Sequence, residues 1–250
     1  MAGHSKWAKV KHFKGAIDAK RAKVFAKLSR ELMIAARMGG GDPDLNPRLR
    51  MVLLKCKSAN MPSENIERAI KKATGEEGAE AFEELLYEVF GPGGVGLLVE
   101  ISTNNRNRTA AEIRALLNRN GGTIATSGAV TRLFQRKGQI LVDREAAEED
   151  RLMELAIEAG AEDFKTREGY YEILTEPAQF EAVHKAFEKA GVKCESAEVT
   201  YVPQLAAPVE DPKALGALNR LIEALEDHDD VKEVHSNAEF NESLQAAEQA

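Results

Sequence analysis

Cationic side chains crowd the beginning of this sequence, and aromatic residues stand among them. The aromatic residues are Trp7 and Phe13, and four lysines surround them: Lys6, Lys9, Lys11 and Lys14. Lys and Arg neutralise phosphates and release counterions, and aromatic rings stack on unpaired bases. The segment therefore predicts phosphate contacts with Trp7 as an anchor. A solvated basic segment whose rings pack inward is the plainer alternative.

A second row of cations falls on a helix predicted over residues 17–38. At about 100° per residue, four cations share one face of this helix: Lys20, Lys23, Lys27 and Arg30. An apolar set lies about 130° away around the axis: Val24, Leu28, Leu32 and Ala35. One face can thus pack on neighbouring helices while the other meets a polyanion. We assign three further cations to the same nucleic-acid surface: Arg21, Arg48 and Arg50.

The polar segment 104–109 is a secondary candidate for contact with an anion or a partner. It delivers Arg106 and Arg108 to a predicted helix N-terminus, where backbone N–H groups favour anions. We expect Thr109 and Glu112 to form the capping box of that helix. A turn stabilised by asparagine side chains is the alternative.

Other motifs give no support for catalysis. Residues 91–96 satisfy G-x-G-x-x-G, but they lead into an apolar strand pattern rather than a helix, so they indicate a hairpin. The five histidines show no pairing with His or Cys at metal-ligand spacing, and no nucleophile motif appears. We predict no catalytic residue, metal, cofactor or small-molecule substrate. An enzyme with clustered, buried acids of raised pKa between its α/β domains stays an alternative.

The overall charge hides a strong asymmetry. The 250 residues carry a net charge of −7, yet residues 1–75 carry +11 and residues 76–250 carry −18. This predicts a polyanionic partner for one end of the chain only. The longest apolar runs fall far short of the ~20 residues that cross a bilayer, and the start is not a secretory signal. Two distant cysteines, Cys56 and Cys194, argue against a disulfide framework. We expect a cytoplasmic protein with no membrane partner.

Hydrophobic spacing and turn residues predict an α+β, multidomain chain. Three helices make an N-terminal bundle, the second of them capped by Asn46 with Pro47 in its first turn. Two α/β sandwich-type domains follow, and the last is a ferredoxin-like βαββαβ unit inserted into the middle one. The predicted segments are a basic helical domain (1–75), a discontinuous α/β domain (76–135 plus 205–240), the inserted domain (136–204) and a frayed tail (241–250).

Several motifs resemble the YebC/PmpR family. The chain opens with MAGHSKW, and further matching motifs extend into the middle of the sequence: DAKR at 18–21, GGDP at 40–43, NMP at 60–62, NIERAIKK at 65–72, GPGG at 91–94 and NRNRT at 105–109. Phe90 stands where members often carry Tyr, and residues 125–129 depart from the usual Gly-rich form.

The resemblance implies a helical bundle followed by two α/β domains, and a non-enzymatic role in gene expression. Bacterial members of the family are usually described as DNA-binding transcriptional regulators. Mitochondrial relatives resemble translational activators, so the resemblance leaves two partners open. We expect a nucleic-acid-binding regulator, with DNA as its partner. The alternative is a ribosome-associated translation factor that binds rRNA and ribosomal proteins.

Overall fold

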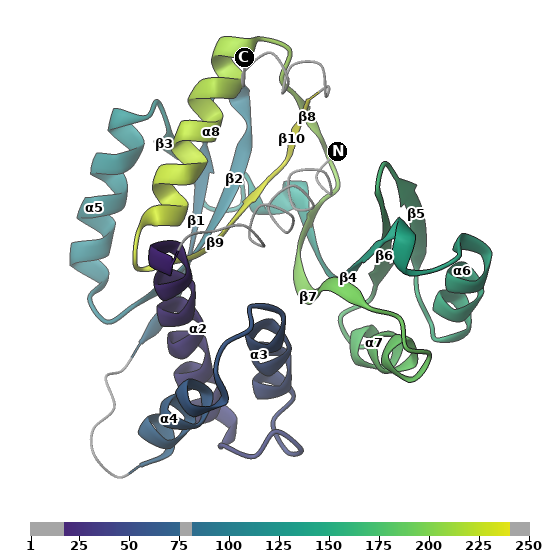
Figure 1. Cartoon of the computed structure of the whole chain (residues 1–250). Helices are drawn as coiled ribbons and strands as arrows, with labels where there is room; N and C mark the ends of the chain where they lie inside the picture. Colours follow the sequence, from purple (N-terminus) through teal and green to yellow (C-terminus); the bar gives the residue numbers. More distant parts are fainter. Residues whose placement is uncertain (1–17, 76–81, 241–250) are drawn as a thin grey trace. The chain divides into compact units, whose positions relative to one another are not determined.

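The computed structural model describes residues 18–75 and 82–240, and these form two compact units. Unit 1 comprises residues 82–135 and 202–240, and unit 2 comprises residues 18–75 and 136–201. The chain passes from one unit to the other within strands β4 (Phe134–Asp143) and β7 (Cys194–Pro203). Figure 1 traces this path along the sequence.

Three helices form the first part of unit 2. They are α2 (Asp18–Gly39), α3 (Pro47–Ser58) and α4 (Ser63–Thr74). The Asn46 side chain accepts a hydrogen bond from the Leu49 N–H at 3.1 Å, which confirms the predicted cap of α3. Its amide nitrogen also donates to the carbonyls of Ala35 and Gly40, each at 2.8 Å. One buried asparagine therefore fixes the end of α2 against the start of α3.

The second part of unit 2 is a four-stranded sheet with two helices. In chain order its elements are β4, α6 (Glu149–Glu158), β5 (Asp163–Arg167), β6 (Tyr170–Thr175), α7 (Phe180–Lys189) and β7. The strand order is β5-β6-β4-β7, as the ferredoxin-like prediction requires. Side chains from the sheet and both helices share one core, which includes Ile140, Ile173, Leu152, Phe180 and Phe187.

Unit 1 is a sheet covered on one face by two helices, as Figure 1 shows. The sheet contains β1 (Glu83–Phe90), β2 (Gly96–Thr103), β3 (Thr123–Ile124) and β9 (Val231–Ser236), in the order β3-β1-β2-β9. The helices are α5 (Arg106–Arg119) and α8 (Pro212–Asp227). Thus the last long strand of the chain pairs with β2, more than a hundred residues earlier.

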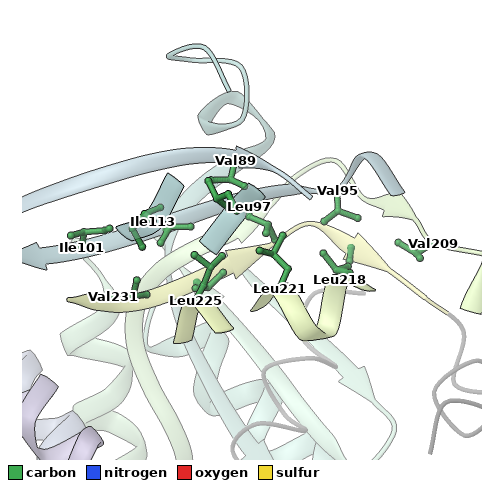
Figure 2. Close-up of a cluster of buried hydrophobic side chains, with 14 of the residues drawn as sticks. Val89, Val95, Leu97, Ile101, Ile113, Val209, Leu218, Leu221, Leu225 and Val231 are labelled. Carbon is green, nitrogen blue, oxygen red and sulfur yellow. The ribbon is translucent and has the colours of Figure 1, made fainter. Parts of the chain in front are cut away.

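The core of unit 1 lies between this sheet and its two helices. Figure 2 shows Leu97 and Val89 of the sheet facing Leu221 and Leu225 of α8, with Ile113 of α5 beside them. These five side chains are fully buried. At roughly 1.5–3 kcal/mol for each fully buried side chain of this size, the cluster supplies much of the unit's stability. It also fixes α5, whose first turn carries the arginines at 106 and 108.

Short elements complete the fold. Pro92–Gly94 forms a 3-10 turn between β1 and β2, with Gly93 and Gly94 at φ values of 76° and 73°. The residues matching G-x-G-x-x-G therefore make a strand connection, as predicted. Further 3-10 turns cover Thr131–Leu133 and Arg144–Ala146, and β8 (Ala207–Pro208) pairs in parallel with β10 (Ala238–Glu239).

One local prediction was wrong. The capping box at Thr109 is absent because the cap of α5 is Asn105, four residues earlier. Asparagine satisfies the first-turn N–H groups as well as threonine does, so the two starts compete in the sequence.

The α+β, multidomain fold class is confirmed. The boundaries at residues 75, 135 and 204 stay predictions, since the structure groups its residues into two compact units.

Candidate nucleic-acid interface

Helix α2 carries five cations of the predicted basic surface. Leu28, Leu32 and Ala35 are buried in the helical core, as the predicted apolar face requires. Arg21 and Lys23 are exposed. The other predicted cations of this helix are Lys20, which lies in α2 but has no described side-chain position, and the half-buried Lys27 and Arg30.

The basic segment that precedes α2 falls outside the described residues. This holds for all five of its predicted contacts: Lys6, Trp7, Lys9, Lys11 and Lys14. Their role as phosphate contacts and as an anchor stays a prediction.

Arg50 of α3 is held inside unit 2. Its Nη2 atom donates a hydrogen bond to a carboxylate oxygen of Glu181 in α7 at 3.0 Å, and its Nε atom lies 3.0 Å from the other oxygen as an ion pair. Its Nη1 atom donates to the carbonyls of Pro43 and Asp44 at 2.6 and 3.0 Å. Lys185 and Arg50 hold the pKa of Glu181 below its usual range. Arg50 therefore supports the fold, whatever contact it makes with a nucleic acid.

The same face of α3 contributes further contacts with the inserted sheet and its helices. Met51 and Leu54 pack against the core of that part of unit 2. Lys55 Nζ lies 2.7 Å from Glu198 of β7, and Lys57 Nζ lies 3.7 Å from Glu188 of α7. Of the two α3 cations assigned to the nucleic-acid surface, Arg50 is thus paired with a carboxylate more than a hundred residues away, as are the neighbouring Lys55 and Lys57.

The Arg48 side chain contacts a different part of the molecule from the Arg50 side chain. It is half-buried, and its Nη1 atom lies 3.0 Å from the Met38 sulfur at the end of α2. Met38 itself is 70% exposed, so Arg48 lies beside an exposed apolar side chain near the connection between α2 and α3.

The two arginines of the secondary candidate have different surroundings. Arg106 is exposed in the first turn of α5. Arg108 Nη2 lies 2.6 Å from the Asp230 carboxylate at the start of β9, and that carboxylate also accepts hydrogen bonds from Thr109 and Thr103. The side-chain turn of Asn105 is present, and contact of Arg106 or Arg108 with an anion or a partner stays a prediction.

Asp230 is the residue that sequence reasoning missed in this cluster. Burial would raise its pKa, but the hydrogen bonds from Thr109 and Arg108 outweigh burial and hold the pKa below its usual range. Its position 122 residues from Arg108 explains why no local pattern revealed it.

Within residues 18–75 and 82–240, two groups of histidine and carboxylate have ligand atoms close enough for a metal ion. The first contains Glu100, Glu233 and His235, and the second contains Glu112, His228 and Asp230. Lys232 lies 3.0 Å from Glu100, and Arg108 contacts Asp230, so a protein cation already neutralises a carboxylate in each group. The donor sets therefore fit internal ion pairing better than binding of a divalent cation.

The enzyme alternative requires buried acids of raised pKa. Among the described carboxylates, those with a resolved shift have lowered pKa values: Glu88, Glu100, Glu176, Glu181 and Asp230. For Glu100, hydrogen bonds from His235 and Lys232 outweigh burial. These acids are stabilised as anions, which suits ion pairing rather than proton donation at neutral pH.

Comparison with known proteins shows to which family this chain belongs. One family model, described as the TACO1/YebC protein N-terminal domain, matches residues 5–76, and another, the TACO1/YebC second and third domain, matches residues 82–238. The chain belongs to the TACO1/YebC family. The resemblance to YebC seen in the sequence motifs is therefore confirmed.

Relatives of high identity share this full length. A protein of Desulfotalea psychrophila is 50% identical over 244 residues, covering 98% of each chain, and one of Treponema denticola is 49% identical over 248 residues, covering 99% of this chain and 100% of the other. Both are named probable transcriptional regulatory proteins. A crystal structure of a conserved hypothetical protein from Aquifex aeolicus is 44% identical, with a TM-score of 0.82, and covers 91% of this chain and 93% of its own. None of the described helices is long and apolar enough to span a membrane.

Proposed function

We propose that this protein is a non-enzymatic regulator of gene expression that binds nucleic acid through its basic N-terminal 75 residues. One observation carries the proposal: residues 1–75 bear +11 while the remainder bears −18. A polyanion is attracted to the first region and repelled by the second, which orients the complex. The names of the relatives, probable transcriptional regulatory proteins, support a regulatory role and favour DNA as the partner.

Phosphate contacts rather than base contacts supply the affinity in this proposal. The proposed contacts are Lys6, Lys9, Lys11, Lys14, Lys20, Arg21, Lys23, Lys27, Arg30, Arg48 and Arg50, with Trp7 as an anchor. Such contacts position a protein on a nucleic acid without reading its sequence. The proposal involves no cofactor, no metal and no small-molecule substrate, and it locates the protein in the cytoplasm.

The acidic remainder of the chain favours a second candidate, a translation factor bound to the ribosome. Residues 76–250 would be repelled by bare DNA, whereas basic ribosomal proteins would attract them. Crosslinking the protein in cells and sequencing the attached nucleic acid separates the two. Chromosomal fragments support the transcriptional role, and ribosomal RNA supports the translational one.

A triple charge reversal tests the binding surface itself. We expect K20E/K23E/K27E to weaken binding to labelled duplex DNA or RNA by about tenfold or more, equally for all sequences, because phosphate contacts are lost. The matched control is K189E/K193E/K213E, which makes the same charge change at three exposed lysines outside the basic region. The control should bind within about twofold of the wild type. Equal affinity of the two triple variants would contradict the assignment of the α2 lysines.

A further inference from the structure

Helix α5 is a basic element on an otherwise acidic unit. Its fourteen residues contain four arginines and a single acid, Glu112. The rest of the described part of unit 1, residues 82–105, 120–135 and 202–240, contains four Lys or Arg and thirteen Asp or Glu. Half of the cations in this unit therefore lie on one helix. The negative average charge of unit 1 therefore conceals a local concentration of positive charge on α5.

The helix packs on the sheet by a narrow apolar side. Thr109, Ile113 and Leu117 are buried, and α8 lies beside α5 on the same face of the sheet (Figure 1). At about 100° per residue, the opposite side of α5 is centred on small and amide side chains. These are Asn107, Ala111, Ala115 and Asn118, and all four are exposed.

Arginines border this small-residue surface on both sides. Arg114 lies on one side and Arg119 on the other, at about 70° from its centre by helical geometry. Both are exposed, as is Arg106 at the first turn. Unlike Arg108, which pairs with Asp230, these three arginines form no ion pair with any residue in the described ranges 18–75 and 82–240.

The position of Arg106 is unfavourable for the isolated fold. The N-terminus of a helix carries a partial positive charge, so a cation there is disfavoured and an anion is favoured. The first turn of α5 contains no acid. At about 100° per residue, Arg106 lies within about 20° of the buried Ile113 and Leu117, so it is exposed at the helix end and is not part of the small-residue side.

We propose that the exposed side of α5 is a second nucleic-acid contact surface, one that holds the phosphodiester backbone between Arg114 and Arg119. This inference rests on the proposed function, because it adds a contact in unit 1 to the N-terminal one. The alanines allow the backbone to approach closely, and the asparagine amides can donate to phosphate oxygens. The helix spans about 20 Å, roughly six base-pair steps at 3.4 Å per step along a strand.

Neutralising the two bordering arginines tests this surface. We expect R114Q/R119Q to bind labelled DNA or RNA about fivefold more weakly, with a salt dependence whose slope falls by about 2. Glutamine is a good helix former, so α5 should persist, and circular dichroism verifies this. The matched control is R132Q/R220Q, which removes two exposed arginines elsewhere in unit 1. The control should keep the wild-type slope and bind within about twofold.

A second pair of variants tests the small-residue centre without removing any arginine. A111E/A115E places two carboxylates between the bordering arginines, and A111Q/A115Q adds side chains of similar size without charge. We expect the glutamate variant to bind at least about fivefold more weakly than the glutamine variant, because carboxylates repel phosphates.

The outcomes separate this inference from the proposed function. If the α5 variants behave like their controls while K20E/K23E/K27E loses affinity, the second surface is rejected and the proposed function stands. If the wild-type protein binds neither DNA nor RNA at low salt, both are rejected. If both sets of variants lose affinity against their controls, the nucleic acid contacts both units.

Discussion

Asp230 at the start of β9 holds Arg108 in the first turn of α5, with 2.6 Å between the carboxylate oxygen and Nη2. The same oxygen accepts a hydrogen bond from Thr109 at 2.7 Å. A buried acid near the end of the chain thus fixes the helix whose exposed side we propose as a contact surface. Asp230 also compensates one of the two arginines at a helix end that disfavours cations.

Replacing this acid with its amide should weaken unit 1. We expect Asp230→Asn to lower the free energy of unfolding by about 2 kcal/mol at pH 7, because hydrogen bonds to a charged group are lost. The folded-state pKa of Asp230 is lowered, so the wild type gains this stability above the unfolded-state pKa and loses it as pH falls through the folded-state pKa. Urea unfolding at several pH values measures the difference.

The difference between wild type and Asp230→Asn should therefore shrink steadily on acidification below about pH 4, near the ordinary pKa of an aspartate. A difference that persists unchanged at pH 2 would show that packing, and not the charge, explains the loss.

Ion pairing between α3 and the inserted part of unit 2 can be measured directly. Lys55 and Glu198 lie 2.7 Å apart with 23% and 12% of their side chains exposed, so this pair is shielded from solvent. A double-mutant cycle with Lys55→Met and Glu198→Gln should give a coupling energy of about 1–2 kcal/mol. The cycle for Arg68 and Glu64, which are exposed and four residues apart on α4, should give about 0.3–0.5 kcal/mol. Equal coupling in both cycles would contradict a structural role for the α3 contact.

Gly138 on β4 lies against residues of β6 and α7 that leave no room for a side chain. A Cβ atom there would lie 2.2 Å from Thr175 Oγ1 and 2.8 Å from Phe180 Cβ. We expect Gly138→Ala to destabilise unit 2 by about 1–3 kcal/mol through overpacking. Thermal unfolding measures this, and the second substitution Thr175→Ala should recover part of the loss by removing the nearest atom. Failure of that recovery would place the strain elsewhere.

Both thiols should be slow to react in the folded protein. Burial, the largest cause, raises the pKa of Cys56 and of Cys194 to about 12. The thiolate is the reactive form, so at pH 8 both cysteines should label far more slowly than after unfolding in urea. Cys56 is buried in the helical core, so its labelling should follow unfolding of unit 2. Rapid labelling of native protein would contradict the described packing.

The sequence was informative wherever a local pattern determines structure. The spacing of Leu28, Leu32 and Ala35 predicted the buried side of α2, and Asn46 before Pro47 predicted the start of α3. Local patterns failed where the relevant partner is distant in the chain. No pattern near Arg50 indicates Glu181, and none near Arg108 indicates Asp230. Charge summed over a segment likewise predicts a binding region, but it does not reveal which cations are already paired.

The pairing of β2 with β9 has a consequence for how the chain is made. Synthesis proceeds from the N-terminus, so α8 and β9 leave the ribosome only after the whole inserted sheet has emerged. All residues of unit 2 have been synthesised once the chain reaches Tyr201, so this unit can fold first. At that stage β2 of unit 1 still lacks its partner β9 and is unpaired along one edge. A nascent chain stalled before residue 231 would therefore expose a hydrophobic strand edge, the kind of surface that chaperones hold and that aggregation begins from.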